Sequence, residues 1–234
     1  MSARKRASIE GADMLEIARL ARLSFRAAGA AILALAFLVP LGSPARAAEC
    51  TDFAIEAERE YDLPPGILLS IALVESGLGG IPQPYAINLD GRPVMAATFE
   101  EARPYLRDGS GRLRKNVMVG CMQIALTYHN GQFKPVDKIL DPRSNVFYAA
   151  RYLKRLRAET GSWSMAVARY QGGTRNQRLT YLCKIHHNLA ALDSGSAALL
   201  DTAHCAQADG PPSIAPETRK KFDARQVASA GLIN

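Results

Sequence analysis

The sequence predicts an α+β protein that is mostly α-helical and carries one small β-hairpin wing. Apolar residues recur at helical spacing in several segments, and the most apolar of these runs from Pro64 to Gly79. Asp90-Gly91 lies between two short extended runs, a pattern typical of a hairpin turn. The 234 residues, 48% of them hydrophobic, are enough for one globular domain with appendages.

Residues 1–47 are predicted to be an export signal. Basic residues precede an uncharged apolar run of 15 residues, Ala27 to Leu41, and we expect cleavage after Ala47. This run is shorter than the roughly 20 residues that span a bilayer, so we expect no stable membrane insertion after cleavage. A lipid anchor on Cys50 is the alternative, but Glu49 does not fit the small residue expected before such a cysteine. The mature protein is therefore expected in the periplasm.

The net charge of +7 does not indicate a nucleic-acid partner. Seven Lys/Arg residues lie in the first 47 positions, which leaves 22 basic residues against 19 acidic ones downstream. No basic run with interleaved aromatic residues appears, so nucleic acid is not expected to bind. HExxH and CxxC spacings are also absent, so we predict neither a metal site nor a cofactor.

The predicted domain spans residues 48–192. A helix capped by Thr51 or Asp52 is expected to run to about Tyr61, and the wing is expected from Tyr85 to Ala96. Apolar spacing and breaker residues predict further helices at 99–106, 144–158, 163–171 and 176–192. Residues 193–234 are rich in Ser, Ala, Gly and Pro and are predicted to be a loosely ordered tail.

Glu75 is the strongest candidate for a reactive group. It ends a predicted helix that begins near Ile67, and it shares a face with Leu68, Ile71 and Ala72. Burial disfavours the ionised carboxyl and the negative end of the helix dipole opposes a further negative charge, so both should raise its pKa. A carboxyl that stays protonated near neutral pH can donate a proton. The ordinary alternative is a structural carboxylate on a partly buried face.

Gln123 interrupts an otherwise apolar run from Val119 to Ile124. A buried Gln needs hydrogen-bond partners, so its side chain is either a structural tie to the backbone or a group directed into a cleft. The run alone does not decide between the two.

The mature chain contains four cysteines, an even number that favours disulfides in an oxidising compartment. Three pairings are possible. We choose Cys183 with Cys205, which would fix the tail to the last helix, and Cys50 with Cys121. In the alternative, Cys121 is simply a small buried apolar residue.

Several short motifs together resemble the catalytic domain of the soluble lytic transglycosylases. They are, in order, Glu75-Ser76, Gly120-Cys-Met-Gln-Ile124, Asn145 with Tyr152-Leu153, Ala166 to Gly173, and Tyr181-Leu-x-x-Ile185. They cover about residues 50 to 190. The resemblance implies a lysozyme-like fold with a small β wing and a cleft that binds peptidoglycan glycan strands.

The resemblance also implies roles for individual residues. Glu75 matches the single catalytic acid/base, and Tyr170 matches a tyrosine across from it. The substrate-binding positions that it implies are Ser76, Met122, Gln123, Tyr170 and Gln171. The family usually has Leu, Gly and Asn where this chain has Cys121, Ala149 and Gln171. Gln171 is longer than Asn, so no particular hydrogen bond is transferred to it.

The function that this resemblance implies is that of a lytic transglycosylase. Glycosidases normally use two carboxylates, but no second Asp or Glu lies in a matching motif. One glutamate suffices if the 6-hydroxyl of the sugar attacks in place of water, which yields a 1,6-anhydro product. Two alternatives stay open: a lysozyme-type hydrolase, and a non-catalytic glycan-binding assembly factor of an envelope-spanning secretion apparatus. An envelope secretion or appendage apparatus is also a possible partner of the enzyme.

Overall fold

The computed structural model describes residues 47–205 and 212–230. Residues 1–46, which hold nearly all of the predicted export signal, lie outside the described part. Among the described residues, no helix combines the length and the apolar character needed to cross a membrane.

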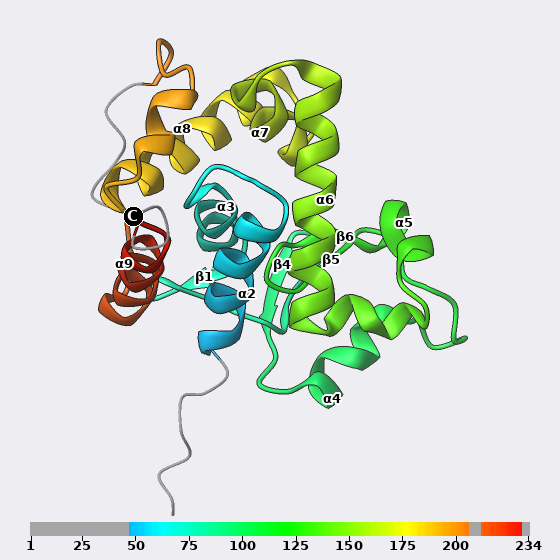
Figure 1. The fold of residues 1–234 in the computed structure, drawn as a ribbon. Helices are drawn as coiled ribbons and strands as arrows, with labels where there is room; N and C mark the ends of the chain where they lie inside the picture. Colours follow the sequence, from blue (N-terminus) through cyan, green and yellow to red (C-terminus); the bar gives the residue numbers. More distant parts are fainter. Residues whose placement is uncertain (1–46, 206–211, 231–234) are drawn as a thin grey trace, which may run out of the picture. The chain divides into compact units, whose positions relative to one another are not determined.

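Five helices form the larger part of the domain (Figure 1), as the sequence predicts. They are α2 (Ala47–Glu60), α3 (Ile67–Ser76), α6 (Pro142–Thr160), α7 (Trp163–Gln171) and α8 (Arg175–Ala191). The N-caps of α6 and α7 are Asp141 and Ser162, whose side chains accept backbone N–H groups of the first turn. The first helix differs from its prediction. Thr51 and Asp52 lie inside α2 and do not cap it.

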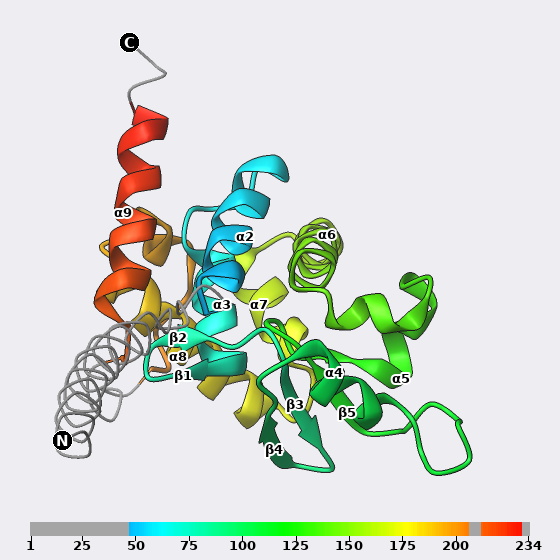
Figure 2. The same ribbon diagram turned by 90° about the horizontal axis from the view of Figure 1, so that it is seen from below.

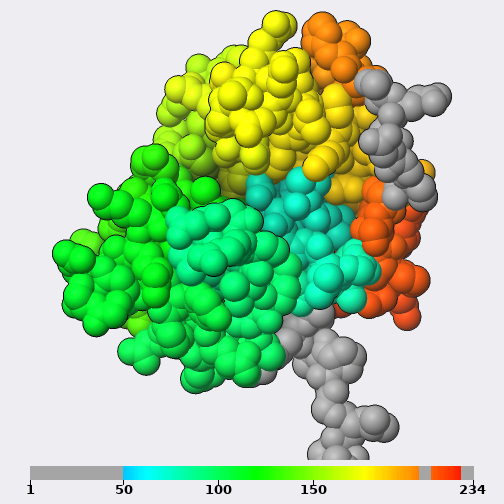
Figure 3. All heavy atoms as spheres, turned by 180° about the vertical axis from the view of Figure 1, so that it is seen from behind, coloured from blue at the N-terminus to red at the C-terminus, as the bar shows by residue number. Residues whose placement is uncertain are grey.

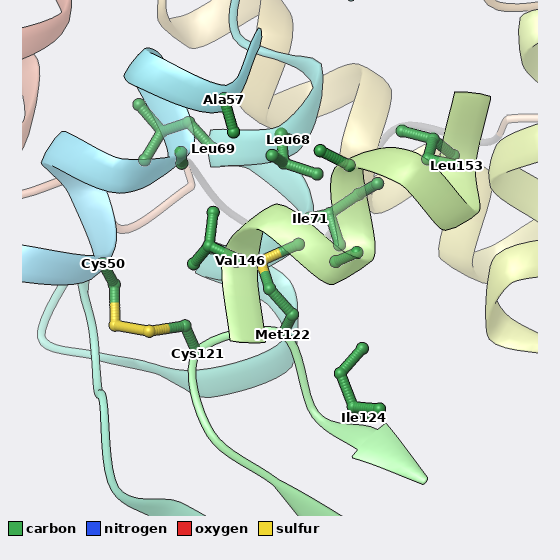
Figure 4. Packing of buried hydrophobic residues seen from close by; sticks show 14 of the residues in the cluster. Cys50, Ala57, Leu68, Leu69, Ile71, Cys121, Met122, Ile124, Val146 and Leu153 are labelled. Carbon is green, nitrogen blue, oxygen red and sulfur yellow. A yellow bond between two sulfur atoms is a disulfide. The ribbon is translucent and has the colours of Figure 1, made fainter. Parts of the chain in front are cut away.

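Helix α3 is the most deeply buried helix of this part. Every residue from Ile67 to Leu73 is buried. Burial of each Leu or Ile side chain among them stabilises the fold by roughly 1.5–3 kcal/mol. Figure 4 shows Leu68 and Leu69 beside Ala57 of α2. The helix ends at Gly77, whose N–H bonds to the carbonyl of Leu73. Its last turn is therefore fixed by the surrounding core.

The β wing is a four-stranded antiparallel sheet with strand order β4-β3-β5-β6. Its strands are β3 (Ala86–Leu89), β4 (Arg92–Met95), β5 (Val117–Val119) and β6 (Ile124–Ala125). The predicted hairpin is confirmed, since β3 and β4 pair around Asp90-Gly91, both of which have positive φ. Strands β5 and β6 were not predicted, because runs of two or three residues show no period. Figure 2 shows the wing on the far side of α3 from α2.

Shorter elements connect these parts. The predicted helix at 99–106 is divided into α4 (Phe99–Ala102) and the 3₁₀ turn η1 (Arg103–Leu106). The others are β1 (Gly77–Leu78) paired with β2 (Ile81–Pro82), α5 (Leu126–His129), η2 (Asn130–Gln132), η3 (Val136–Leu140) and η4 (Gly195–Leu199).

The prediction of a loosely ordered tail is wrong for much of residues 193–234. Helix α9 (Pro216–Ala230) packs beside α2, and Phe222 is only 2% exposed. The hydroxyl of Thr218 donates to the carbonyl of Gly80, and Lys221 pairs with Asp52. One buried aromatic ring and a few polar anchors hold this helix. A search for sustained apolar periodicity therefore missed it.

The chosen disulfide pairing is confirmed. Cys50 bonds to Cys121, and Cys183 bonds to Cys205. Figure 4 shows the first bond at the edge of the buried cluster. Because the sulfur of Cys50 is in a disulfide, it is not free to carry the lipid of the alternative considered above. The second disulfide ties the end of the 193–205 segment to α8.

Candidate active site

Glu75 lies in the last turn of α3, close to α7 and α8. The hydroxyl of Tyr181, on α8, donates a hydrogen bond of 2.7 Å to Oε1 of Glu75. In Figure 3 the cyan part of the chain, which includes α3, lies between the yellow part and the green part. The hydrogen bond from Tyr181 thus joins the last turn of α3 to α8.

The environment of Glu75 raises its pKa to about 7. Burial is the largest cause, while the hydrogen bond from Tyr181 and the positive charge of Lys184 lower the pKa. The predicted direction is confirmed. No other carboxylate is among these causes. A carboxyl whose pKa lies near neutral pH can both donate and accept a proton there.

Tyr170, on α7, is close enough to Glu75 for the carboxylate charge to affect it. Burial raises the pKa of its phenol well above the usual value, and the charge of Glu75 raises it further. Its hydroxyl, however, donates to the carbonyl of Met122 at 2.9 Å. The direct hydrogen bond to the carboxylate comes from Tyr181, to which the sequence analysis gave no role.

The turn from Gly120 to Gln123 is built around the buried side chain of Asn145. Its Oδ1 accepts the N–H of Met122, and its Nδ2 donates to the carbonyls of Val119 and Ile139, each at 2.9 Å. Gly120 has φ 79°, and a Cβ there would lie 2.7 Å from Nδ2 of Asn145. Only glycine adopts this positive φ readily and has no Cβ to clash with Asn145, which explains its place in the motif.

Gln123 is a structural tie, the first of the two readings. Its Nε2 donates to the carbonyl of Ala86 at 3.0 Å and to that of Gly120 at 3.1 Å. Its own backbone has φ 45°. The side chain therefore connects the wing to the turn below it and uses its amide protons to do so. The side chain of Met122, predicted to line the cleft, is completely buried in the core, and its substrate contact stays a prediction.

Ser76 is likewise buried and connects backbone groups of two segments, while its contact with substrate stays a prediction. The residue is only 2% exposed, and its hydroxyl donates to the carbonyl of Cys121 at 2.8 Å. The same hydroxyl accepts the N–H of Gln83 at 3.2 Å. It joins the end of α3 to the disulfide-bonded turn. Gln171, by contrast, is exposed at the last position of α7, where a ligand can reach it.

Two functional candidates escaped the sequence reasoning. Tyr181 was quoted within a motif but given no role, although Tyr181, Ile185 and Asn188 recur on one helical face and all are buried. Glu58 is a buried carboxylate on the inward face of α2, in register with Ala54 and Ala57. A charged residue on an otherwise apolar face was the signal in this case.

No metal centre is apparent in the part of the chain that the structure describes. Within it, no three His, Cys, Asp or Glu side chains are grouped so that they could hold an ion.

Comparison with known proteins assigns much of the chain to a family. A family model described as the Transglycosylase SLT domain matches residues 52–181. This region includes Glu75, Asn145, Tyr170 and Tyr181. Neither the curated proteins nor the solved structures gave a match.

Proposed function

Because the chain belongs to the transglycosylase SLT domain family, we propose that it is a peptidoglycan lytic transglycosylase. The family supports glycan cleavage of this type in general. The proposed reaction breaks the β-1,4 bond between MurNAc and GlcNAc and leaves a 1,6-anhydro-MurNAc end. Glu75 is proposed as its only acid/base.

The proposed mechanism uses Glu75 twice. Protonated Glu75 first donates its proton to the glycosidic oxygen, and the bond from C1 of MurNAc to that oxygen breaks. The 2-acetamido group of the same sugar stabilises the positive charge at C1, as in other substrate-assisted glycosidases. Ionised Glu75 then takes the proton from the 6-hydroxyl while O6 bonds to C1. The enzyme returns to its protonated state, and no water is consumed.

The environment of Glu75 is the observation that supports this proposal most. A pKa of about 7 lets one group act first as acid and then as base near neutral pH. Tyr181 orients the carboxylate through its hydroxyl, and Lys184 supplies the only charge among the causes of the pKa shift.

Mass analysis of the soluble products from purified glycan strands tests the proposal. An anhydro-ended fragment is one water lighter than the reducing-ended fragment that a lysozyme-type hydrolase releases. We expect Glu75→Gln to lower turnover by roughly 10²- to 10⁴-fold, since the amide cannot exchange a proton. Asp90→Asn in the wing is the matched control and should keep wild-type turnover. Reducing-ended products would identify a hydrolase. Saturable glycan binding without cleavage would favour the non-catalytic assembly factor.

We also propose that the mature protein acts in the periplasm. N-terminal sequencing of the protein from an envelope fraction should begin at Ala48 or Glu49, and an uncleaved Met1 in the cytoplasm would contradict export. An envelope secretion or appendage apparatus remains a predicted partner, which co-purification from the same fraction would test.

A further inference from the structure

A buried carboxylate lies at the opposite end of α3 from Glu75. Glu58 is only 4% exposed, although it carries an ionisable group. Its Oε2 accepts the N–H of Gly66 at 2.8 Å. Its Oε1 accepts the N–H groups of Leu68 at 2.7 Å and Leu69 at 3.0 Å. All three donors belong to the start of α3, whereas Glu58 itself belongs to α2.

The start of α3 has no cap of its own. Its N-cap residue, Gly66, follows Pro64-Pro65, adopts φ 84° and provides no side-chain hydrogen bond. A helix leaves its first N–H groups without intrahelical partners, and these are usually satisfied by a side chain or by water. Here Ile67, Leu68 and Leu69 are completely buried, so water does not reach them readily. Glu58 takes the place of the missing cap.

The other end of α3 is connected to the same neighbouring helix. Ser76 donates to the carbonyl of Cys121, and Cys121 is disulfide-bonded to Cys50 near the start of α2. Helix α2 therefore holds α3 at both ends, by Glu58 at the first turn and through the disulfide at the last. The position of Glu75 along the axis of α3 depends on both attachments.

We propose that Glu58 is a positioning residue for Glu75, which it controls by capping the helix that carries it. This role rests on the proposed function, and it assigns to Glu58 no contact with substrate. Three hydrogen bonds that converge on one carboxylate fix the helix along its axis. A shift of the helix by 1 Å would carry the Glu75 carboxyl out of line with the glycosidic oxygen, and misplacement of that size can cost about 100-fold in rate.

Glu58 is not among the causes that set the pKa of Glu75, which are burial, the hydrogen bond from Tyr181 and the charge of Lys184. Glu58 therefore acts on Glu75 through the position of α3. Burial and the three backbone N–H groups are the causes that act on Glu58 itself, and no charged side chain is among them.

Two substitutions separate the cap from its charge. Glu58→Gln keeps an oxygen that can accept from Leu68 and Leu69, but its NH₂ cannot accept from Gly66 and its charge is gone. Glu58→Met removes all three acceptors at similar volume. We expect kcat per folded molecule to fall about 10-fold in Glu58→Gln and about 100-fold in Glu58→Met, with KM within about 2-fold of wild type. In both variants the titration midpoint of Glu75, followed by NMR of labelled glutamate, should rise, because a shifted helix loosens the hydrogen bond from Tyr181 that lowers its pKa.

Leu156→Ala is the control for lost stability alone. It opens a cavity in the core on α6, where Leu156 is 3% exposed, without touching either end of α3. We expect it to lower the melting temperature but to leave kcat per folded molecule and the Glu75 midpoint unchanged. If Glu58→Gln behaves like this control, Glu58 is only a structural residue and the proposal is overturned. The NMR midpoint needs no turnover, so it judges the proposal even if the wild-type protein does not cleave glycan.

Discussion

Tyr181→Phe is the most direct probe of how the protein sets the pKa of Glu75. The substitution removes one hydroxyl and leaves the ring, which is 5% exposed, in its place. That hydroxyl donates to Oε1 of Glu75 and lowers its pKa, whereas burial raises it. Without this hydrogen bond, only the charge of Lys184 still offsets the effect of burial on the pKa. The pKa of Glu75 should therefore rise above its present value of about 7.

The size of the shift follows from the strength of this hydrogen bond. A hydrogen bond to a charged group contributes about 1.5–3 kcal/mol, and 1.36 kcal/mol corresponds to one pKa unit. Glu75 is partly exposed and keeps the charge of Lys184 nearby, so we expect the lower end of this range, about one unit. The basic limb of kcat/KM, which reports the free enzyme's acid, should move from near pH 7 to near pH 8. The maximal rate should fall because the carboxyl is no longer oriented.

The assay is the release of soluble fragments from purified peptidoglycan between pH 5 and 9 at constant ionic strength. Tyr170→Phe is the matched control, because its hydroxyl donates to the carbonyl of Met122 and not to Glu75. It should leave the basic limb within about 0.3 pH unit of wild type. A basic limb that stays in place in Tyr181→Phe, or an equal shift in the control, would refute the reasoning.

Two further predictions concern stability. The folded pKa of Glu75, about 7, exceeds its ordinary value of 4.5, so the folded state binds more protons between these values and stability falls as pH rises through them. Glu75→Gln should therefore raise the free energy of unfolding by about 2 kcal/mol at pH 8, after allowance for partial exposure, and by almost nothing at pH 4.5. Urea titrations that gave equal effects at both pH values would contradict this. Asn145→Ala leaves three buried backbone groups unpaired and should lower the free energy of unfolding by about 3 kcal/mol, whereas a loss below about 1 kcal/mol would show that other groups pair with them.

The helices and the hairpin were predictable because their local signals agree with the fold. Regular apolar spacing marks α6 and α7, Ser162 caps α7, and Asp90-Gly91 marks the hairpin turn. The last helix was not predictable in this way. Its placement depends on Phe222 meeting Gly66 and on Lys221 meeting Asp52, contacts between residues more than 150 positions apart. A pattern within one segment of the sequence cannot predict such long-range contacts.

The candidate site was predictable in identity but not in the division of roles. Glu75 stands out because it is a carboxyl on an apolar helical face. Five motif residues were assigned to substrate, but two of them, Ser76 and Met122, have buried side chains. A motif shows that a residue is needed. It does not show whether that residue contacts a ligand itself or positions another residue that does. Only the hydrogen-bond partners separate these cases, and the partners of Ser76 lie on the turn at Cys121 and in the loop at Gln83.

Two carboxyl groups, Glu75 at the end of α3 and Glu58 of α2 at its start, have environments that raise their pKa to about 7, but their tasks differ. Glu75 needs a proton for the first proposed step and must lose it for the second. Glu58 accepts three N–H groups and does so best when ionised, since a proton on either oxygen removes an acceptor. Low pH would thus supply the catalytic proton while weakening the cap that positions it. The acid limb of the pH profile should therefore contain a contribution from Glu58 as well as from Glu75, and Glu58→Gln, which cannot titrate, should remove that contribution.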